Sequence, residues 1–359
     1  MWKSLSKFER FIAISLVVTV IVGQLFRFFP SLTQWIYTEG FFIVSSRLLH
    51  FILGWIPFSV GDCLYVLVGV LVLRRIFKLI IKYTIRKGIL WFKLFLLFSS
   101  FYVFFQWMWG FNYSKVSLHE QLHISSEYTT EELVEISEKL LHKTNSLQLK
   151  IKGNDSTKVE FPTNFNQMKN DVYKAFASFK NDTSLQLLPN TQNIKKSLIS
   201  GPLTYMGFSG YINPFTNEAQ VNSWIPASKW YVTSTHEIAH QLGYAKENEA
   251  NFIATYVCTQ QEENLAMQYA GYNFALRYCL GDLYYRNRDQ FEYFYNCIHP
   301  GIIAEYQANS EFWEYYDNAL EPLFKLIYGS YLVANDQPDG LDTYSYVTAL
   351  IVNHGLGLK

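Results

Sequence analysis

The feature that most constrains this chain is a run of sixteen uncharged residues near its start, Phe11 to Phe26 (FIAISLVVTVIVGQLF). With its flanks, this run reaches the roughly 20 apolar residues that an α-helix needs to cross a bilayer. A cleavable signal peptide is the alternative, but no small-x-small cleavage site follows, and the sequence RFFP at 27–30 is typical of an interfacial end. The run therefore predicts a first membrane span at about 11–29.

Two further apolar segments predict a second span at about 56–73 and a third at about 89–107. The third carries Lys93 near its beginning, within snorkelling reach of the membrane surface. The segment between the first two spans, 32–55, is shorter and more interrupted, and we interpret it as an interfacial or re-entrant helix, with a crossing left open. Residues 1–109 are thus predicted to form a three-helix transmembrane anchor.

Basic residues indicate how this anchor is oriented. Lys3, Lys7 and Arg10 precede the first span, and six more basic residues fill 74–87, between the second and third spans. Positively charged loops stay on the cytoplasmic side, so three crossings would place residues 110–359 on the extracytoplasmic side of the cytoplasmic (inner) membrane. A fourth crossing at 32–55 would put that domain in the cytoplasm and the basic loop on the wrong side.

Composition bounds the partners of the chain. Thirty basic and thirty acidic residues balance over 359 residues, which argues against a nucleic-acid partner recruited by bulk positive charge. Four cysteines are too few for a disulfide framework. Cys63 lies in a predicted span, and none of the other three has the spacing of a zinc knuckle, so we expect no cysteine ligand.

The remaining residues, 110–359, read as one domain of mixed structure. Helical spacing is found at about 129–147 and 165–179, and nearly the whole of 246–333 is predicted to be helical. Residues 199–226 contain Gly, Pro and Asn between short alternating segments, which predicts a hairpin or small sheet. The expected fold class is therefore mainly α, with an α+β domain that has a small sheet and a helical C-terminal half.

Within this domain, residues 236–240 spell H-E-x-x-H. Four residues make one turn of a helix, so His236 and His240 can reach one Zn²⁺ while Glu237 contacts its bound water. Gly243 then supplies a helix stop. The alternative is an amphipathic helix with two incidental histidines.

A zinc hydrolase needs a third protein ligand, and Glu247 and Glu249 follow in the run ENEAN. These two glutamates lie about 200° apart on a helix, so only one of them can face the metal. We favour Glu247, because Ala250 allows close helix packing and Asn251 could hydrogen-bond a ligand histidine. Glu249 remains the alternative.

H-E-x-x-H followed by E-x-x-A-N resembles the signature of gluzincin metallopeptidases, although here only six residues separate His240 from Glu247. On a larger scale, the three spans, the WGFNY sequence at 109–113 and the HEIAHQLGYAKENEANF sequence at 236–252 resemble the bacterial family called domain of unknown function 3810. This resemblance covers nearly the whole chain. It implies a membrane-anchored zinc peptidase with a zincin-like domain and names no substrate.

The expected function is hydrolysis of peptide bonds in a protein or peptide by a zinc-activated water, with Glu237 as the general base. Tyr344, after a predicted turn near the C-terminus, is our candidate for an oxyanion donor. Two other functions remain open: an inactive zincin-like sensor or binding protein, and an amidase acting on a cell-wall peptide. The intact Glu237 argues against the first of these.

Overall fold

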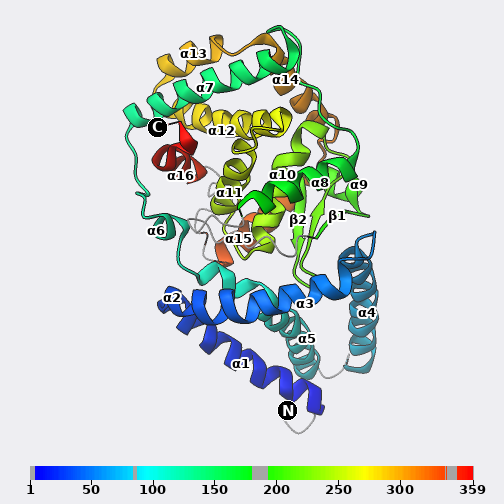
Figure 1. Cartoon of the computed structure of the whole chain (residues 1–359). Helices are drawn as coiled ribbons and strands as arrows, with labels where there is room; N and C mark the ends of the chain where they lie inside the picture. Colours follow the sequence, from blue (N-terminus) through cyan, green and yellow to red (C-terminus); the bar gives the residue numbers. More distant parts are fainter. Residues whose placement is uncertain (1–4, 84–86, 180–192, 336, 338–345, 359) are drawn as a thin grey trace. The chain divides into compact units, whose positions relative to one another are not determined.

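The structure is a computed structural model that describes residues 5–83, 87–179, 193–335, 337 and 346–358 (Figure 1). It divides into two compact units. Unit one comprises Met1–Val116 together with Asn213–Glu218, and unit two comprises Ser117–Ile212 and Ala219–Lys359. A short piece of the second half of the sequence thus belongs to the N-terminal unit.

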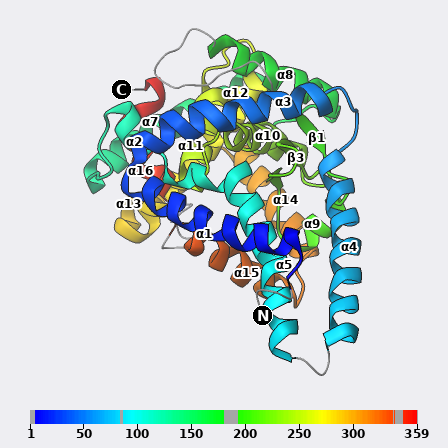
Figure 2. The same ribbon diagram turned by 90° about the horizontal axis from the view of Figure 1, so that it is seen from below.

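Unit one is entirely helical in its N-terminal part. Its elements are α1 (Lys7–Phe28), α2 (Pro30–Leu32), the π-helix η2 (Thr33–Phe42), α3 (Ile43–Leu53), α4 (Val60–Tyr83), α5 (Lys87–Met108) and the 3-10 helix η3 (Gly110–Ser114). The sequence Pro30–Leu53 forms one continuous rod, visible in Figures 1 and 2 as the long blue helix between the labels α2 and α3.

Three helices in the described part of the chain are long and apolar enough to cross a membrane: Lys7–Phe28, Pro30–Leu53 and Gly88–Met108. The first and third agree with the expected spans, and such helices are typical of a membrane protein. The segment 32–55, expected to be an interfacial or re-entrant helix, is helical as far as Leu53 and is long and apolar enough to cross a membrane. The expected second span at 56–73 falls within α4, which begins only at Val60. This helix is not one of the three, because it carries Asp62, Arg74 and Arg75.

An ion-pair cluster joins α1, α4 and α5 at one end of unit one. Lys93 at the start of α5 contacts Glu9 at the start of α1 (2.7 Å), and Arg75 in the second half of α4 contacts the same carboxylate (3.4 Å). At the other end, the indole N–H of Trp107 on α5 donates to Thr19 on α1 (2.9 Å). These contacts show that α1 and α5 run in the same direction, with α4 antiparallel to them.

The rod Pro30–Leu53 makes its contacts at the opposite end from the ion pairs. The hydroxyl of Tyr37 donates to the main-chain oxygen of Trp107 (3.0 Å), and Thr38 donates to the side chain of Asn112 (3.0 Å). Both acceptors lie at or beyond the last turn of α5. The rod therefore lies against the ends of α1 and α5 that are remote from Glu9.

The inserted segment Asn213–Glu218 binds at this same end. Asn217 donates from its side chain to Ser46, and its main-chain oxygen lies 2.8 Å from Nε2 of His50, both on α3. Glu218 accepts from the first main-chain N–H groups of α4, at 2.7 Å from Gly61, where a carboxylate complements the helix dipole. Phe215 stacks on Phe104 of α5, with 4.8 Å between ring centroids.

Unit two is mainly helical with a three-stranded sheet, as predicted. Its helices are α6 (Leu118–Leu122), α7 (Thr130–Lys152), α8 (Phe165–Ser178), α9 (Ser200–Tyr205), α10 (Ala227–Gln241), α11 (Glu247–Thr259), α12 (Leu265–Arg286), α13 (Arg288–Asn296), α14 (Pro300–Tyr315), α15 (Glu321–Ala334), α16 (Val347–His354) and the 3-10 helix η6 (Gly355–Gly357). Its strands are β1 (Ile194–Lys196), β2 (Gly210–Asn213) and β3 (Glu218–Val221).

The sheet has the order β1-β3-β2, so within the described residues β2 is an edge strand. β2 and β3 form the hairpin predicted in 199–226. β1 pairs in parallel with β3, Ile194 opposite Ala219, a pairing that the sequence analysis did not predict. Parallel pairing joins segments distant in the chain, so local sequence gives little sign of it.

One hydrophobic core supports the helices of unit two. Helices α10, α11 and α12 contribute fully buried side chains, among them Ile238, Phe252 and Leu276. The apolar face of α10 thereby points into the core, and its other residues are free to form a site. All four cysteines are free thiols. The sequence likewise predicted no disulfide framework.

Candidate metal centre

Helix α10 carries the H-E-x-x-H sequence in its last two turns and ends just after it. Gly243 has φ of 87°, a left-handed conformation that glycine adopts without strain. The N–H of Gly243 donates to the main-chain oxygen of His240 (2.9 Å), and the N–H of Tyr244 donates to the main-chain oxygen of Ala239 (3.1 Å). This is the Schellman pattern of a helix end. This reversal lets α11 begin at Glu247, with only six residues between it and His240.

The reversal brings Glu247 back against both histidines. Oε2 of Glu247 lies 3.2 Å from Nε2 of His236 and 3.6 Å from Nε2 of His240. One ligand atom from each of the three residues lies within 4.8 Å of the others. Glu247 is 3% exposed, so its charge is buried and needs a compensating cation.

These distances allow a test of whether a metal ion fits. Four donors at about 2.0–2.1 Å from a tetrahedral zinc lie roughly 3.3 Å from one another. The two measured separations, 3.2 and 3.6 Å, are close to that value. Oε2 of Glu247 is also a buried oxygen that lacks a hydrogen-bond partner in the described part of the chain. The donor set of two imidazoles and one carboxylate fits Zn²⁺.

The tautomer of His240 is suited to metal binding. Its Nδ1 lies 2.7 Å from the main-chain oxygen of Tyr244, in the reversal after α10. A carbonyl oxygen can only accept, so Nδ1 must carry a proton, and in the neutral ring Nε2 then presents its lone pair to Glu247. Asn251, on the next turn of α11, favours the charged form of the His236 ring. Outer contacts of this kind orient metal-binding histidines in other proteins.

The ionisable groups of the site are strongly coupled. Burial disfavours the charged imidazolium, but the Glu247 carboxylate outweighs it and raises the pKa of His240 to about 9. Burial and the positive charge of His240 both lower the pKa of His236. Burial opposes the negative charge of Glu247, but His240 holds the pKa of Glu247 well below its usual value. His240 thus carries the one extra proton of the three groups, and its positive charge offsets the Glu247 carboxylate. A dication at the same place would be held more tightly.

Glu237 faces the same space and is not one of the three clustered ligands. Burial raises the pKa of its carboxyl group to about 8, and its Oε2 is buried with no hydrogen-bond partner among the described residues. Gly210 of the edge strand β2 lies directly against it. A Cβ atom at position 210 would lie 2.7 Å from Oε1 of Glu237, so only glycine lets the strand approach this closely.

Glu249, the alternative ligand, points elsewhere. Its Oε1 accepts a hydrogen bond from the main-chain N–H of Leu118 (2.9 Å), at the first turn of α6. Glu249 therefore binds the start of a neighbouring helix, whereas Glu247 faces the histidines. The two side chains diverge as expected for residues two apart on a helix.

A tyrosine other than the predicted one reaches the site. Tyr344 lies outside the described residues. Tyr328 on α15 donates from its hydroxyl to Oε1 of Glu247 at 2.7 Å, leaving Oε2 toward the histidines. The ring of Tyr328 packs edge-on against Phe208, with 5.2 Å between centroids. Tyr328 is 81 residues away from Glu247 in sequence, so no local pattern could have identified it.

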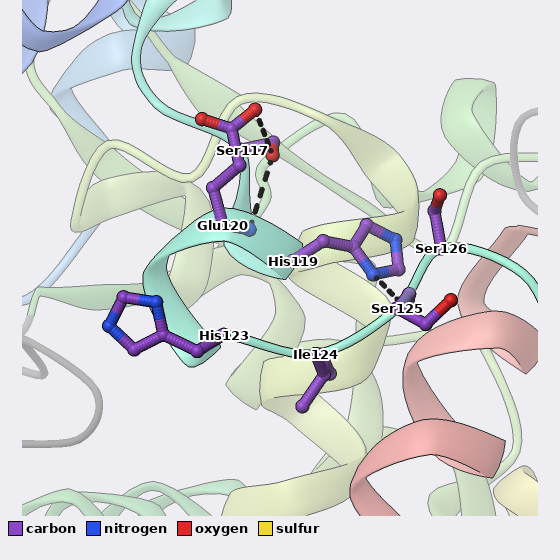
Figure 3. Close-up of a pocket in the computed structure, with 7 residues that line it drawn as sticks. All are labelled: Ser117, His119, Glu120, His123, Ile124, Ser125 and Ser126. Carbon is purple, nitrogen blue, oxygen red and sulfur yellow. Dashed lines mark hydrogen bonds between the residues drawn. The ribbon is translucent and has the colours of Figure 1, made fainter.

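A second H-E-x-x-H sequence occurs at 119–123, and the sequence analysis did not single it out. Helix α6 ends before His123, which adopts a left-handed conformation with φ of 54°. Nδ1 of His119 binds the main-chain oxygen of Ser125 (3.0 Å). Figure 3 shows the two imidazoles on opposite sides of the short helix, lining an open pocket. Spacing alone therefore does not make a metal site here.

Comparison with known proteins gives a family and no activity. No curated protein matches the chain, and no solved structure matches it. The family described as "protein of unknown function (DUF3810)" matches residues 37–352, which include most of each unit and all the candidate metal ligands. The chain therefore belongs to the DUF3810 family.

Proposed function

We propose that this protein is a membrane-anchored, zinc-dependent metallopeptidase. The observation that carries the proposal is the convergence of His236, His240 and Glu247 at separations suited to a tetrahedral ion, with the buried Glu237 beside them. His236, His240 and Glu247 would hold the ion. Zinc, when bound, lowers the pKa of a bound water to about 7 and polarises a carbonyl group.

The other residues of the site have roles that follow from their positions. Glu237 accepts a proton from the attacking water and returns it to the leaving amine, a task helped by a pKa near neutrality. Tyr328 orients Glu247 through its hydroxyl. The edge strand β2, with Gly210 against Glu237, offers main-chain groups to which an extended peptide can add as a further strand.

We also propose that α1, α4 and α5 cross the membrane and that the rod Pro30–Leu53 lies along its outer surface. The rod is apolar enough to span, but its contacts through Tyr37 and Thr38 are with the outer end of α5. The first turn of α4 binds Glu218 at that same end, and its basic second half reaches Glu9 at the other. The basic ends then face the cytoplasm, and unit two is extracytoplasmic.

The test is zinc content of the purified full-length protein, measured by mass spectrometry, together with cleavage of a peptide library. Wild type and Glu237→Gln should each hold about one zinc, whereas His236→Ala and Glu247→Ala should hold none. Only wild type should cleave peptides. His123→Ala, in the other H-E-x-x-H sequence, is the matched control and should keep both zinc and activity.

The outcomes separate the proposal from its alternatives. A folded wild type that takes up no zinc would overturn the metal site. Zinc binding without hydrolysis of any peptide would favour a sensor or binding protein. Cleavage restricted to cell-wall peptides would favour the amidase. Loss of zinc in Glu237→Gln would mean that Glu237 is a ligand and not the base.

A further inference from the structure

Helix α15 exposes an apolar face that a water-exposed helix would not normally have. Leu320, just before the helix, and four residues within it are each half or more exposed: Leu323, Leu326, Ile327 and Val333. At 100° per residue these side chains fall within an arc of roughly 140°. Single exposed apolar residues need no explanation, but a contiguous face of this kind marks an interaction surface.

The arc contains no charged residue. The two charged residues of α15, Glu321 and Lys325, form an ion pair with each other (2.6 Å) and lie on the side of the helix opposite the arc, the side that also carries the buried Leu332. The small Ser330 is the polar residue within the arc, and its hydroxyl donates a hydrogen bond to the main-chain oxygen of Leu326 (2.8 Å). By contrast, the exposed face of α7 carries Glu135 and Glu138.

Aromatic residues flank one end of this face. Asn318, just before α15, donates to the main-chain oxygen of Tyr205 (2.7 Å), and the rings of Tyr205 and Tyr316 meet at 5.2 Å. Trp224 lies 6.5 Å from Tyr316, and both Tyr205 and Trp224 are about half exposed. Exposed Trp and Tyr beside an apolar surface are typical of a membrane interface, where their rings sit at the level of the head groups.

We infer that this face of α15 inserts into the outer interfacial layer of the bilayer that anchors the chain. The bilayer is the occupant that the chain itself suggests, because three helices among the described residues are apolar enough to enter it. An uncharged arc with aromatic residues at its rim fits lipid better than it fits a polar protein partner.

The opposite face of α15 carries Tyr328, which binds Glu247. Insertion would therefore keep the candidate metal centre at the membrane surface, and it does not depend on whether the centre is active.

The test uses the full-length protein in lipid nanodiscs, with the exposed thiols removed as Cys63→Ser and Cys297→Ser. A spin label is attached at Leu323→Cys, Leu326→Cys, Ile327→Cys or Ser330→Cys, one at a time. Ser330→Cys is nearly isosteric and should not disturb folding. Glu138→Cys on α7, in the same unit, is the control.

We expect labels at the four α15 positions to favour collision with oxygen over a water-soluble nickel complex by at least threefold relative to the label at Glu138. In the same nanodiscs, the preference of the label at Leu323→Cys for oxygen over the nickel complex should fall when Leu326→Glu is added. Equal access to the nickel complex at all positions would show a water-exposed face and overturn the inference. Protection from both reagents would show a protein contact, such as a second copy, and overturn it as well.

Discussion

Replacing Tyr328 by phenylalanine removes one hydroxyl group, the one that donates to Oε1 of Glu247 at 2.7 Å. That bond leaves Oε2 as the oxygen that faces His236 and His240, so it fixes which carboxylate atom is offered to a metal ion. Without it, the carboxylate can rotate about its terminal torsion. We therefore expect Tyr328→Phe to weaken zinc binding while leaving all three ligands in place.

The size of the effect follows from the kind of bond. A hydrogen bond to a charged group contributes about 1.5–3 kcal/mol. Tyr328 is only partly buried, so the lower half of that range applies, and each 1.4 kcal/mol is a tenfold change in affinity. The dissociation constant for zinc should rise by roughly 10- to 40-fold, within the range seen when outer contacts of metal ligands are removed.

The assay is competition between the full-length protein and a chelator of known zinc affinity. Tyr331→Phe is the matched control, because it removes the same atom from the ring that stacks on Tyr328 at 5.8 Å. We expect Tyr331→Phe to stay within twofold of wild type. If Tyr328→Phe also stays within twofold, Tyr328 does not position Glu247. If both variants weaken binding equally, the cause is repacking of α15.

Three further predictions concern neighbours of the site. Glu249→Gln should keep zinc and lower the free energy of unfolding, measured in urea, by about 1 kcal/mol. The main-chain N–H of Leu118 would keep a hydrogen-bond acceptor, but that acceptor would no longer be charged. Loss of zinc would instead make Glu249 a ligand. His123→Ala should leave zinc content unchanged, since that ring belongs to the sequence that does not form a cluster; a halved content would reveal a second site. Gly210→Ala should keep zinc but lower kcat at least tenfold, because the new Cβ would press on Glu237; unchanged kcat would show that β2 yields freely.

The part of the site that sequence could predict is the part made by neighbours in sequence. The spacing of His236 and His240 and the divergence of Glu247 and Glu249 follow from helix geometry, and the glycine marks the helix end. The preference for Glu247 rests on Ala250 and Asn251, which follow it on the same helix. The structure brings these residues together as that geometry requires. Tyr328 and Gly210 approach the site through tertiary packing, which leaves no periodic signal in the sequence.

The two H-E-x-x-H sequences show where spacing ceases to be informative. His236 and His240 lie in a helix of 15 residues that is buried against the core, whereas His119 is the second residue of a helix of only five. Only a helix that continues past its second histidine keeps both rings on one face. The Schellman reversal at Gly243 comes after His240, but the left-handed residue at the other sequence is His123 itself.

Composition was informative in the same limited way for the membrane segments. Hydropathy over 18 residues selects Pro30–Leu53 and omits α4, because basic residues occupy the second half of α4. The contacts of each helix give a different view. Arg75 of α4 reaches Glu9 at one end of the unit, and Gly61 of α4 reaches Glu218 at the other. A helix that connects both ends is the better candidate for a span than a rod bound at one end.

The turn of the β2–β3 hairpin, residues 213–218, is grouped with unit one, where α3, α4 and α5 hold it. Gly210, at the start of β2, lies against Glu237 in unit two. An edge strand fixed at its turn loses little conformational freedom when a peptide adds to it, and such preorganisation favours binding. A fixed turn would therefore lower the conformational cost of adding a peptide to the strand that lies against Glu237.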